Sequence, residues 1–139
     1  MVTYSECEYA VAGFFSTLLG VTLGDNFFIG ELPDTVTKGL MIDLDNELVS
    51  LNVIDNGKGY REFTLSLVGK FDDIDTAYMY LEKVENKFPL YGVDVILNNK
   101  TVEIMSIIEQ AVNGVEVYYD DGDKIFVISN RYVTKIKNK

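Results

Sequence analysis

The residues of this chain that could carry out chemistry are chiefly carboxylates and tyrosines. Its 139 residues include 22 acidic residues and 9 tyrosines, with one cysteine and no histidine. The lack of histidine removes the most common general base and the most common zinc ligand. Together with the single cysteine, it also excludes a Cys/His zinc site within one chain. We therefore expect no catalytic residue, no metal and no cofactor, and predict that the protein is not an enzyme.

One group of carboxylates has regular spacing. Asp43, Asp45 and Glu47 alternate along the chain, so their side chains are expected on one face of a strand. Such a face can accept a hard cation such as Ca²⁺, but the glycine and the bidentate acid of an EF-hand loop are missing. A solvated strand edge explains the three acids more simply than a metal site.

A second acidic group surrounds a glycine in the sequence Asp120-Asp121-Gly122-Asp123. These residue types favour a tight hairpin turn. Tyr118 and Tyr119 precede the turn, and one of them should be exposed because adjacent strand residues point to opposite faces. An exposed tyrosine here is either an ordinary surface residue or part of a subunit contact, where tyrosine is enriched.

The net charge of −10 limits the possible partners. It argues against a protein that reads nucleic acid, because such a protein needs basic patches to displace phosphate counterions. An acidic surface favours solubility, and it also suits a channel through which DNA passes without binding. No phosphate-binding GxxxxGK[ST] or GxGxxG motif and no GxSxG nucleophile motif occurs in the sequence.

The C-terminal segment carries 5 of the 12 basic residues within the last 16 positions. These residues are Lys124, Arg131, Lys135, Lys137 and Lys139. On an acidic protein this distribution predicts a dipolar molecule. The segment is either a solvated tail or a strand that pairs with an acidic neighbour, and self-complementary charge favours head-to-tail contacts.

The N-terminal sequence MVTYSECE is acidic where a secretory signal would be basic. No apolar run approaches the ~20 residues that span a bilayer. We therefore expect a protein that is neither exported by a classical signal nor embedded in a membrane. Cys7 lies in an amphipathic segment and is expected to be a small buried apolar side chain.

Two helices are predicted from apolar periodicity. Residues 5–19 repeat apolar side chains at helical spacing, Ser5 and Glu8 have capping-box spacing, and Gly20 follows as a stop. Residues 73–88 have the clearer pattern, in which an aspartate caps the start and Pro89 follows the end. Its expected apolar face contains Ile74, Ala77, Tyr78, Leu81, Val84 and Phe88.

The remaining elements are expected to be strands, bounded by turn-forming residues. The predicted strand segments are 27–30, 39–44, 47–54, 60–70, 93–97, 101–112, 115–119 and 124–135. The most regular is 60–70, in which Phe63, Leu65 and Leu67 face one way. The order predicts one α+β domain over residues 1–139, with a mainly antiparallel sheet and two amphipathic helices packed on one face.

Several segments also follow the pattern of a known family. Residues 24–33, GDNFFIGELP, form a strand that ends in a leucine–proline turn; residues 60–69 form an alternating strand that leads into a helix over 72–81; residues 125–133 form a closing strand. In this order they resemble the small tail-terminator, or minor capsid, proteins of long-tailed phages. The chain has Gly69-Lys70 where that family often has arginine, and Gly59 where it often has proline.

The resemblance implies a virion structural protein and no covalent chemistry. Six subunits would form a ring that caps the tail tube, stops its polymerisation and joins it to the head-side connector or stopper protein. The ring would lie at the head–tail junction after assembly in the bacterial host cytoplasm, with DNA only as passing cargo. The candidate lumen or interface residues are Asp43, Asp45, Asp120, Asp121, Tyr119 and Arg131.

Two other classes of function remain open from the sequence. One is a small acidic phage-encoded module that binds or inhibits a basic target by mimicking nucleic acid. It predicts a monomer or dimer with a concentrated acidic face. The other is an enzyme that uses carboxylates or a tyrosine, which predicts a deep pocket with a strongly shifted carboxylate.

Overall fold

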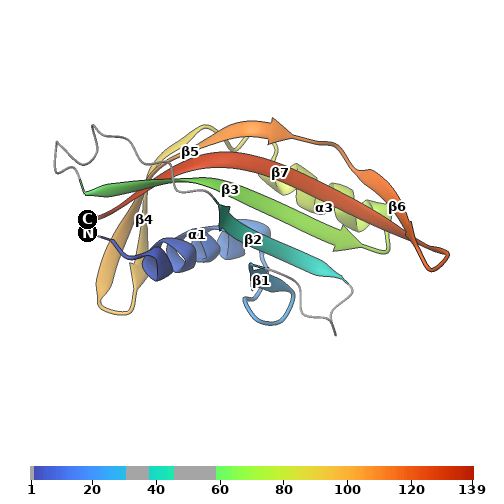
Figure 1. Cartoon of the computed structure of the whole chain (residues 1–139), viewed down its shortest axis with the longest axis horizontal. Helices are drawn as coiled ribbons and strands as arrows, with labels where there is room; N and C mark the ends of the chain where they lie inside the picture. Colours follow the sequence, from blue (N-terminus) through green and yellow to red (C-terminus); the bar gives the residue numbers. More distant parts are fainter. Residues whose placement is uncertain (1, 31–37, 46–58) are drawn as a thin grey trace.

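The computed structural model describes residues 2–30, 38–45 and 59–139. In this part the chain forms two helices and one mixed, mostly antiparallel sheet of seven strands (Figure 1). The elements are α1 (Tyr4–Leu19), β1 (Phe27–Ile29), β2 (Gly39–Asp45), β3 (Tyr60–Phe71), α3 (Ile74–Val84), β4 (Leu90–Leu97), β5 (Lys100–Val112), β6 (Glu116–Asp120) and β7 (Asp123–Asn138). The fold is α+β with the sheet dominant, which confirms the predicted class.

The strand order is β1-β2-β3-β7-β5-β4, and β6 pairs with β7 outside this path. β1 and β2 are parallel, whereas every other pairing is antiparallel. The sheet is arched, and α1 and α3 lie together in its concave side (Figure 1). α1 contacts β4 and β5, α3 contacts β3 and β7, and the two helices contact each other. Both helices therefore pack on one face, as predicted.

The start of α1 differs from the prediction by a small shift. The capping box is formed by Thr3 and Glu6, not by Ser5 and Glu8. The Thr3 amide donates to the Glu6 carboxylate at 2.8 Å, and the Glu6 amide donates to the Thr3 hydroxyl at 3.1 Å. At the other end, Gly20 adopts φ 69° and ends the helix as predicted. Cys7 is buried, also as predicted.

α3 is shorter than the predicted helix 73–88. Asp73 is its N-cap, where the carboxylate accepts from the amide and the hydroxyl of Thr76 at 3.2 and 3.0 Å. The helix ends at Val84, and Asn86 has φ 61°, so Phe88 packs into the core from the following loop. The predicted apolar face was partly wrong, because Ile74 and Tyr78 are exposed.

The core lies between the helices and the concave face of the sheet. On β3, Phe63, Leu65 and Leu67 are buried and face the helices, which confirms the predicted alternation. At the centre, the ring of Tyr132 lies 4.7 Å from that of Phe88 and 6.0 Å from that of Phe15. All these side chains belong to one apolar cluster, so the helices and the sheet share a single core.

The C-terminal segment is a strand, as one of the two alternatives predicted, and not a solvated tail. It forms β7, a 16-residue strand in the middle of the sheet. Three lysines of the segment form ion pairs with acids on other strands: Lys135 with Glu62 on β3, Lys137 with Glu103 on β5, and Lys139, which follows the end of β7, with Asp94 on β4. The predicted strand 47–54, which includes Glu47, and the leucine–proline turn lie outside the described residues.

Candidate functional site

The six predicted lumen or interface residues lie in two separate places. Asp43 and Asp45 are on β2 and Arg131 is on β7, in the body of the sheet. Tyr119, Asp120 and Asp121 lie at the end of the β6–β7 hairpin. The structure therefore does not bring all six together.

The acids of β2 form a close pair. Asp43 and Asp45 alternate with Leu44, and lie where β2 has no pairing with β1. Partial burial raises the pKa of Asp43 to about 6, and a hydrogen bond with Asp45 and the charges of Asp45 and Glu8 add to the shift. The register aligns Asp43 with Ser66 and then with Arg131, two strands away. Hence Asp43 and Arg131 share one row across the sheet.

Arg131 is exposed on the sheet face that points away from the helices. Its β3 neighbour is Ser66 and its β5 neighbour is Ala111, so no carboxylate flanks it directly on either strand. Among the ion pairs formed by the described residues, none includes Arg131. Its guanidinium is available to bind a carboxylate of another molecule.

The β6–β7 hairpin projects from one end of the molecule (Figure 1). Asp121 and Gly122 have φ 48° and 85°, so positive φ at both central residues gives a tight two-residue turn, as the sequence predicted. The pairing between β3 and β7 stops at Phe71 and Phe126. Beyond this point β7 pairs only with β6 within the described residues, so the tip is a two-stranded ribbon.

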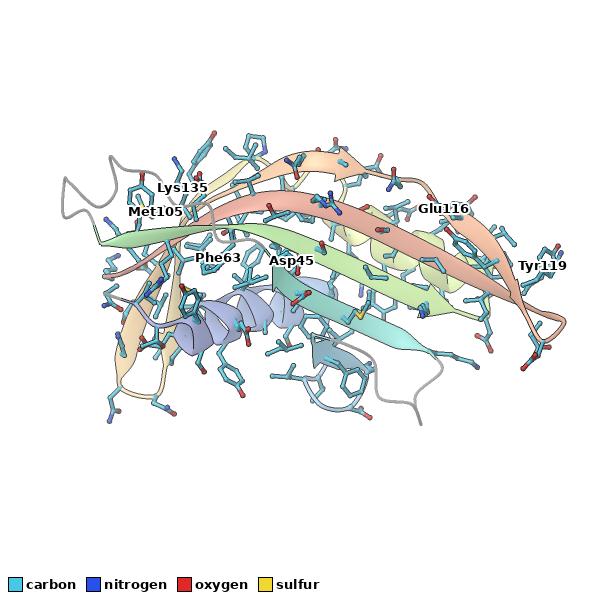
Figure 2. The ribbon with its side chains drawn as sticks, viewed as in Figure 1. Asp45, Phe63, Met105, Glu116, Tyr119 and Lys135 are labelled. Atoms are coloured by element: carbon cyan, nitrogen blue, oxygen red, sulfur yellow. The ribbon has the colours of Figure 1, made fainter. Side chains whose placement is uncertain are left out.

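The ribbon exposes apolar side chains on both faces. Tyr118 and Tyr119 are 53% and 69% exposed, and Val117 is exposed beside them. The sequence predicted that only one of the two tyrosines would be exposed. Both are exposed because no layer of described residues covers either face of the projecting ribbon. The Tyr118 hydroxyl donates to Glu116 at 2.5 Å, and this bond raises the pKa of Tyr118. Figure 2 shows Tyr119 at this end of the molecule.

A groove of about 790 Å³ lies toward the opposite end, between α1 and the β4–β5 turn. Small residues of α1 form its floor: Ala12, Gly13 and Ser16. Tyr9 on α1 and Ile96 on β4 line its sides, and Ile96 is 76% exposed. This groove was not predicted from the sequence. The sequence feature that could have indicated it is Ile96, an apolar residue at a position that alternates with the inward-facing residues Val93, Val95 and Leu97.

The charges around this groove are compensated within the chain. Lys100 lies 2.6 Å from Glu6 and, by its hydrogen bond, lowers the pKa of Glu6 to about 2 together with the Thr3 amide. Near the same end, Glu62, Glu103 and Asp94 each pair with a lysine of the C-terminal segment. The hairpin end differs, since Asp121 and Asp123 are exposed there and neither belongs to an ion pair of the described residues.

Neither a metal-binding cluster nor a membrane-spanning helix is found among the described residues. Across residues 2–30, 38–45 and 59–139, no group of three or more His, Cys, Asp or Glu side chains is placed to hold a metal ion. Asp43 and Asp45 come together, while the third acid of the calcium hypothesis, Glu47, is outside that part of the chain. No helix in the same part of the chain is long and apolar enough to cross a bilayer.

Comparison with known proteins adds no identification. No protein-family model matches the chain, and no curated protein matches its sequence. The functional interpretation therefore depends on the surfaces described above and on the residues that carry the family resemblance.

Proposed function

We propose that this protein is a virion structural subunit of the tail-terminator kind. In this proposal, copies of the chain form a closed ring, six in number, on the end of a completed tail tube. The ring stops polymerisation of the tube protein and presents its other side to the head-side connector or stopper protein. DNA passes through the ring as cargo, and the protein performs no covalent chemistry.

The observation that carries the proposal is the pair of different apolar surfaces at opposite ends of the molecule. The hairpin exposes Tyr118 and Tyr119, and the groove exposes Tyr9 and Ile96. Two different surfaces at opposite ends favour heterologous, head-to-tail contacts between identical chains. Such contacts form closed rings when the rotation between neighbours closes.

Charge and chain order also support the proposal. The net charge of −10 suits a ring whose inner wall repels DNA and lets it slide. Asp43 and Asp45 lie together at a sheet edge and are the candidates for that wall among the described residues. The order of elements follows the resemblance to tail terminators, with an N-terminal helix, an alternating strand leading into a helix, and a closing antiparallel sheet.

The proposed function is tested by its effect on tail-tube growth. Purified tail-tube protein encoded in the same genome as this chain is polymerised with and without the protein, and tube lengths are measured by negative-stain electron microscopy. Shorter tubes with a visible cap at one end support a terminator. Tubes of unchanged length without caps, at protein concentrations above that of tube ends, contradict it.

A second candidate is a small acidic module that binds a basic protein. The exposed Asp121 and Asp123 at the tip of the hairpin favour it, because a projecting acidic tip can enter a basic site. This function requires a monomer or dimer that binds its target without self-assembly. Analytical ultracentrifugation separates the two candidates, since a ring of about six chains and a monomer of 15.7 kDa sediment very differently.

A further inference from the structure

The hairpin tip has the features of a surface that another protein covers. Its apolar side chains are on both faces of a two-stranded ribbon that ends in a tight turn. Tyrosines contribute large contact area with little loss of conformational entropy, and they are enriched at the centres of interfaces. A surface that receives this tip must therefore offer apolar contact to the exposed side chains and tolerate the carboxylates at the turn.

The groove beside α1 has the shape and chemistry to receive such a tip. Its volume of about 790 Å³ falls within the range of about 300–1,000 Å³ that is typical of small-molecule pockets, which is large enough for an aromatic side chain. The small side chains of Ala12 and Gly13 let another chain approach the helix closely, and Tyr9 and Ile96 provide apolar walls. Its rim includes the turn residues Asn98, Asn99 and Lys100, whose side chains offer hydrogen-bond donors.

Both regions also border a strand edge that is unpaired within the described residues. β4 is the last strand in the sheet order, and among the described residues it pairs with β5 alone. β6 pairs only with β7 in the same part of the chain. An exposed edge presents a row of N–H and C=O groups that can pair with a strand from another chain.

The two ends differ in charge. The turn at the hairpin tip contributes the exposed carboxylates of Asp121 and Asp123, which only accept hydrogen bonds when ionised. The groove lining has one acid and one base, Glu6 and Lys100, which pair with each other, and the amides of Asn98 and Asn99 offer uncharged donors. Two hairpin tips facing each other would instead bring like charges together, which is unfavourable.

We infer that the β6–β7 hairpin of one copy docks in the groove between α1 and the β4–β5 turn of the next copy. Tyr119 lies against Tyr9 and Ile96 in this contact, and the edge of β6 runs alongside the edge of β4. The contact is heterologous, because each copy gives a hairpin and receives one. The inference rests on the proposed ring and specifies which surfaces hold neighbouring subunits together.

Disulfide trapping tests the contact directly. A double variant, Tyr119→Cys with Ile96→Cys, is oxidised under mild conditions beside each single variant; Cys7 stays in place because it is fully buried. The expected result is a ladder of covalent oligomers that ends at the closed ring, formed by the double variant only. Dimers formed by Tyr119→Cys alone would show hairpins that pair with each other, and would overturn the inference.

The same experiment separates failure of the contact from failure of the proposed function. Light scattering is measured on each sample with and without tail tubes before oxidation. If light scattering shows oligomers but oxidation gives no disulfide ladder, the hairpin–groove contact is wrong while the proposed ring is not contradicted. A monomer under every condition overturns both the contact and the ring.

A charge substitution gives a second, independent readout. Tyr119→Asp places a charge at the centre of the contact and is expected to raise the dissociation constant between subunits at least about tenfold. The matched control is Tyr78→Asp on α3, because Tyr78 is 46% exposed and borders neither the hairpin nor the groove. Equal dissociation constants for the two variants would overturn the inference.

Discussion

Tyr132 and Tyr119 are both strand tyrosines, but they lie in regions with opposite properties. Tyr132 is at the middle of β7, fully buried against Phe15 and Phe88 under both helices. Tyr119 is at the tip of β6, where only two strands remain and 69% of the side chain is exposed. The centre of the sheet therefore determines whether the chain folds. We expect the hairpin to contribute little to folding, and the proposed ring assigns it to contact with another copy.

Environment also separates the two phenols chemically. Burial raises the pKa of Tyr132 to about 12, although Asn130 donates a hydrogen bond of 3.1 Å to its hydroxyl. Its ring contributes to the core as a large apolar body. The exposed tyrosines of the hairpin keep apolar rings in contact with water, which is unfavourable unless a partner covers them. Variants in the two regions should therefore change different measurements.

Truncation in the aromatic centre should have the largest effect on stability. Phe15→Ala removes a fully buried ring that contacts Phe14, Phe88 and Tyr132. We expect the free energy of unfolding to decrease by about 3–5 kcal/mol, from lost apolar burial and the cavity left behind. Urea denaturation followed by circular dichroism measures it. Tyr9→Ala on the exposed side of α1 is the control, and a loss below about 1 kcal/mol for Phe15→Ala would contradict the described core.

Overpacking at the sheet centre should have the next largest effect. A Cβ added at Gly69 would lie 2.7 Å from the ring of Phe71 and 2.8 Å from Leu40, and both of these side chains are buried. Gly69→Ala should therefore lower the free energy of unfolding by about 1–3 kcal/mol. Gly114→Ala is the matched control, since nothing lies within 4 Å of its added Cβ. Equal stability of the two variants would show that β3 and β2 pack differently.

The acidic pair on β2 should make stability depend on pH. Because the pKa of Asp43 is raised to about 6 in the folded protein, the folded state binds this proton more tightly than the unfolded state. Protonation of Asp43 in the folded state therefore contributes stability that is complete below about pH 4 and is lost as the pH rises through about 6. Asp43→Asn removes the repulsion from Asp45 and Glu8 in the ionised state.

We expect Asp43→Asn to raise the free energy of unfolding at pH 7 by up to about 1 kcal/mol, after allowance for solvent screening of a partly exposed group. At pH 4 the variant and the parent protein should be nearly equal. Thermal unfolding at both pH values measures the difference. The same gain at pH 4 as at pH 7 would mean that ionisation of Asp43 is not its cause.

The hairpin variant should have the smallest effect on stability. Tyr119→Asp, which is expected to weaken contacts between copies, should change the free energy of unfolding of the monomer by less than about 0.5 kcal/mol. Its side chain contributes no contact to the core cluster of the described residues. Denaturation at low protein concentration measures this value. A decrease of several kcal/mol in the free energy of unfolding would mean that Tyr119, like Tyr132, stabilises the fold, and would contradict the contrast between the two residues.

The sequence predicted those parts of the fold in which local pattern and burial agree. In β3, Phe63, Leu65 and Leu67 alternate with polar residues, and the strand is half-buried as expected. Asp121-Gly122 predicted the hairpin turn because few other residue pairs adopt positive φ so readily. Asp73 likewise predicted the start of α3.

Features that depend on distant segments were not predicted. β7 carries basic residues at alternate positions, which resembled a solvated segment, but the acids that pair with them come from strands 30 or more residues earlier. The groove combines α1 with a turn about 80 residues later in the chain. The exposure of both hairpin tyrosines depends on where β3 ends beside β7, and no local pattern encodes that position.

The most direct test of the central claim, that this chain is a ring-forming structural subunit, is its mass in solution. Multi-angle light scattering is measured across protein concentration and salt, alone and with tail tubes, and any large species is imaged by negative stain. We predict closed rings of about six copies, either free or bound to tube ends. A protein that remains a 15.7 kDa monomer in all these conditions would contradict the account.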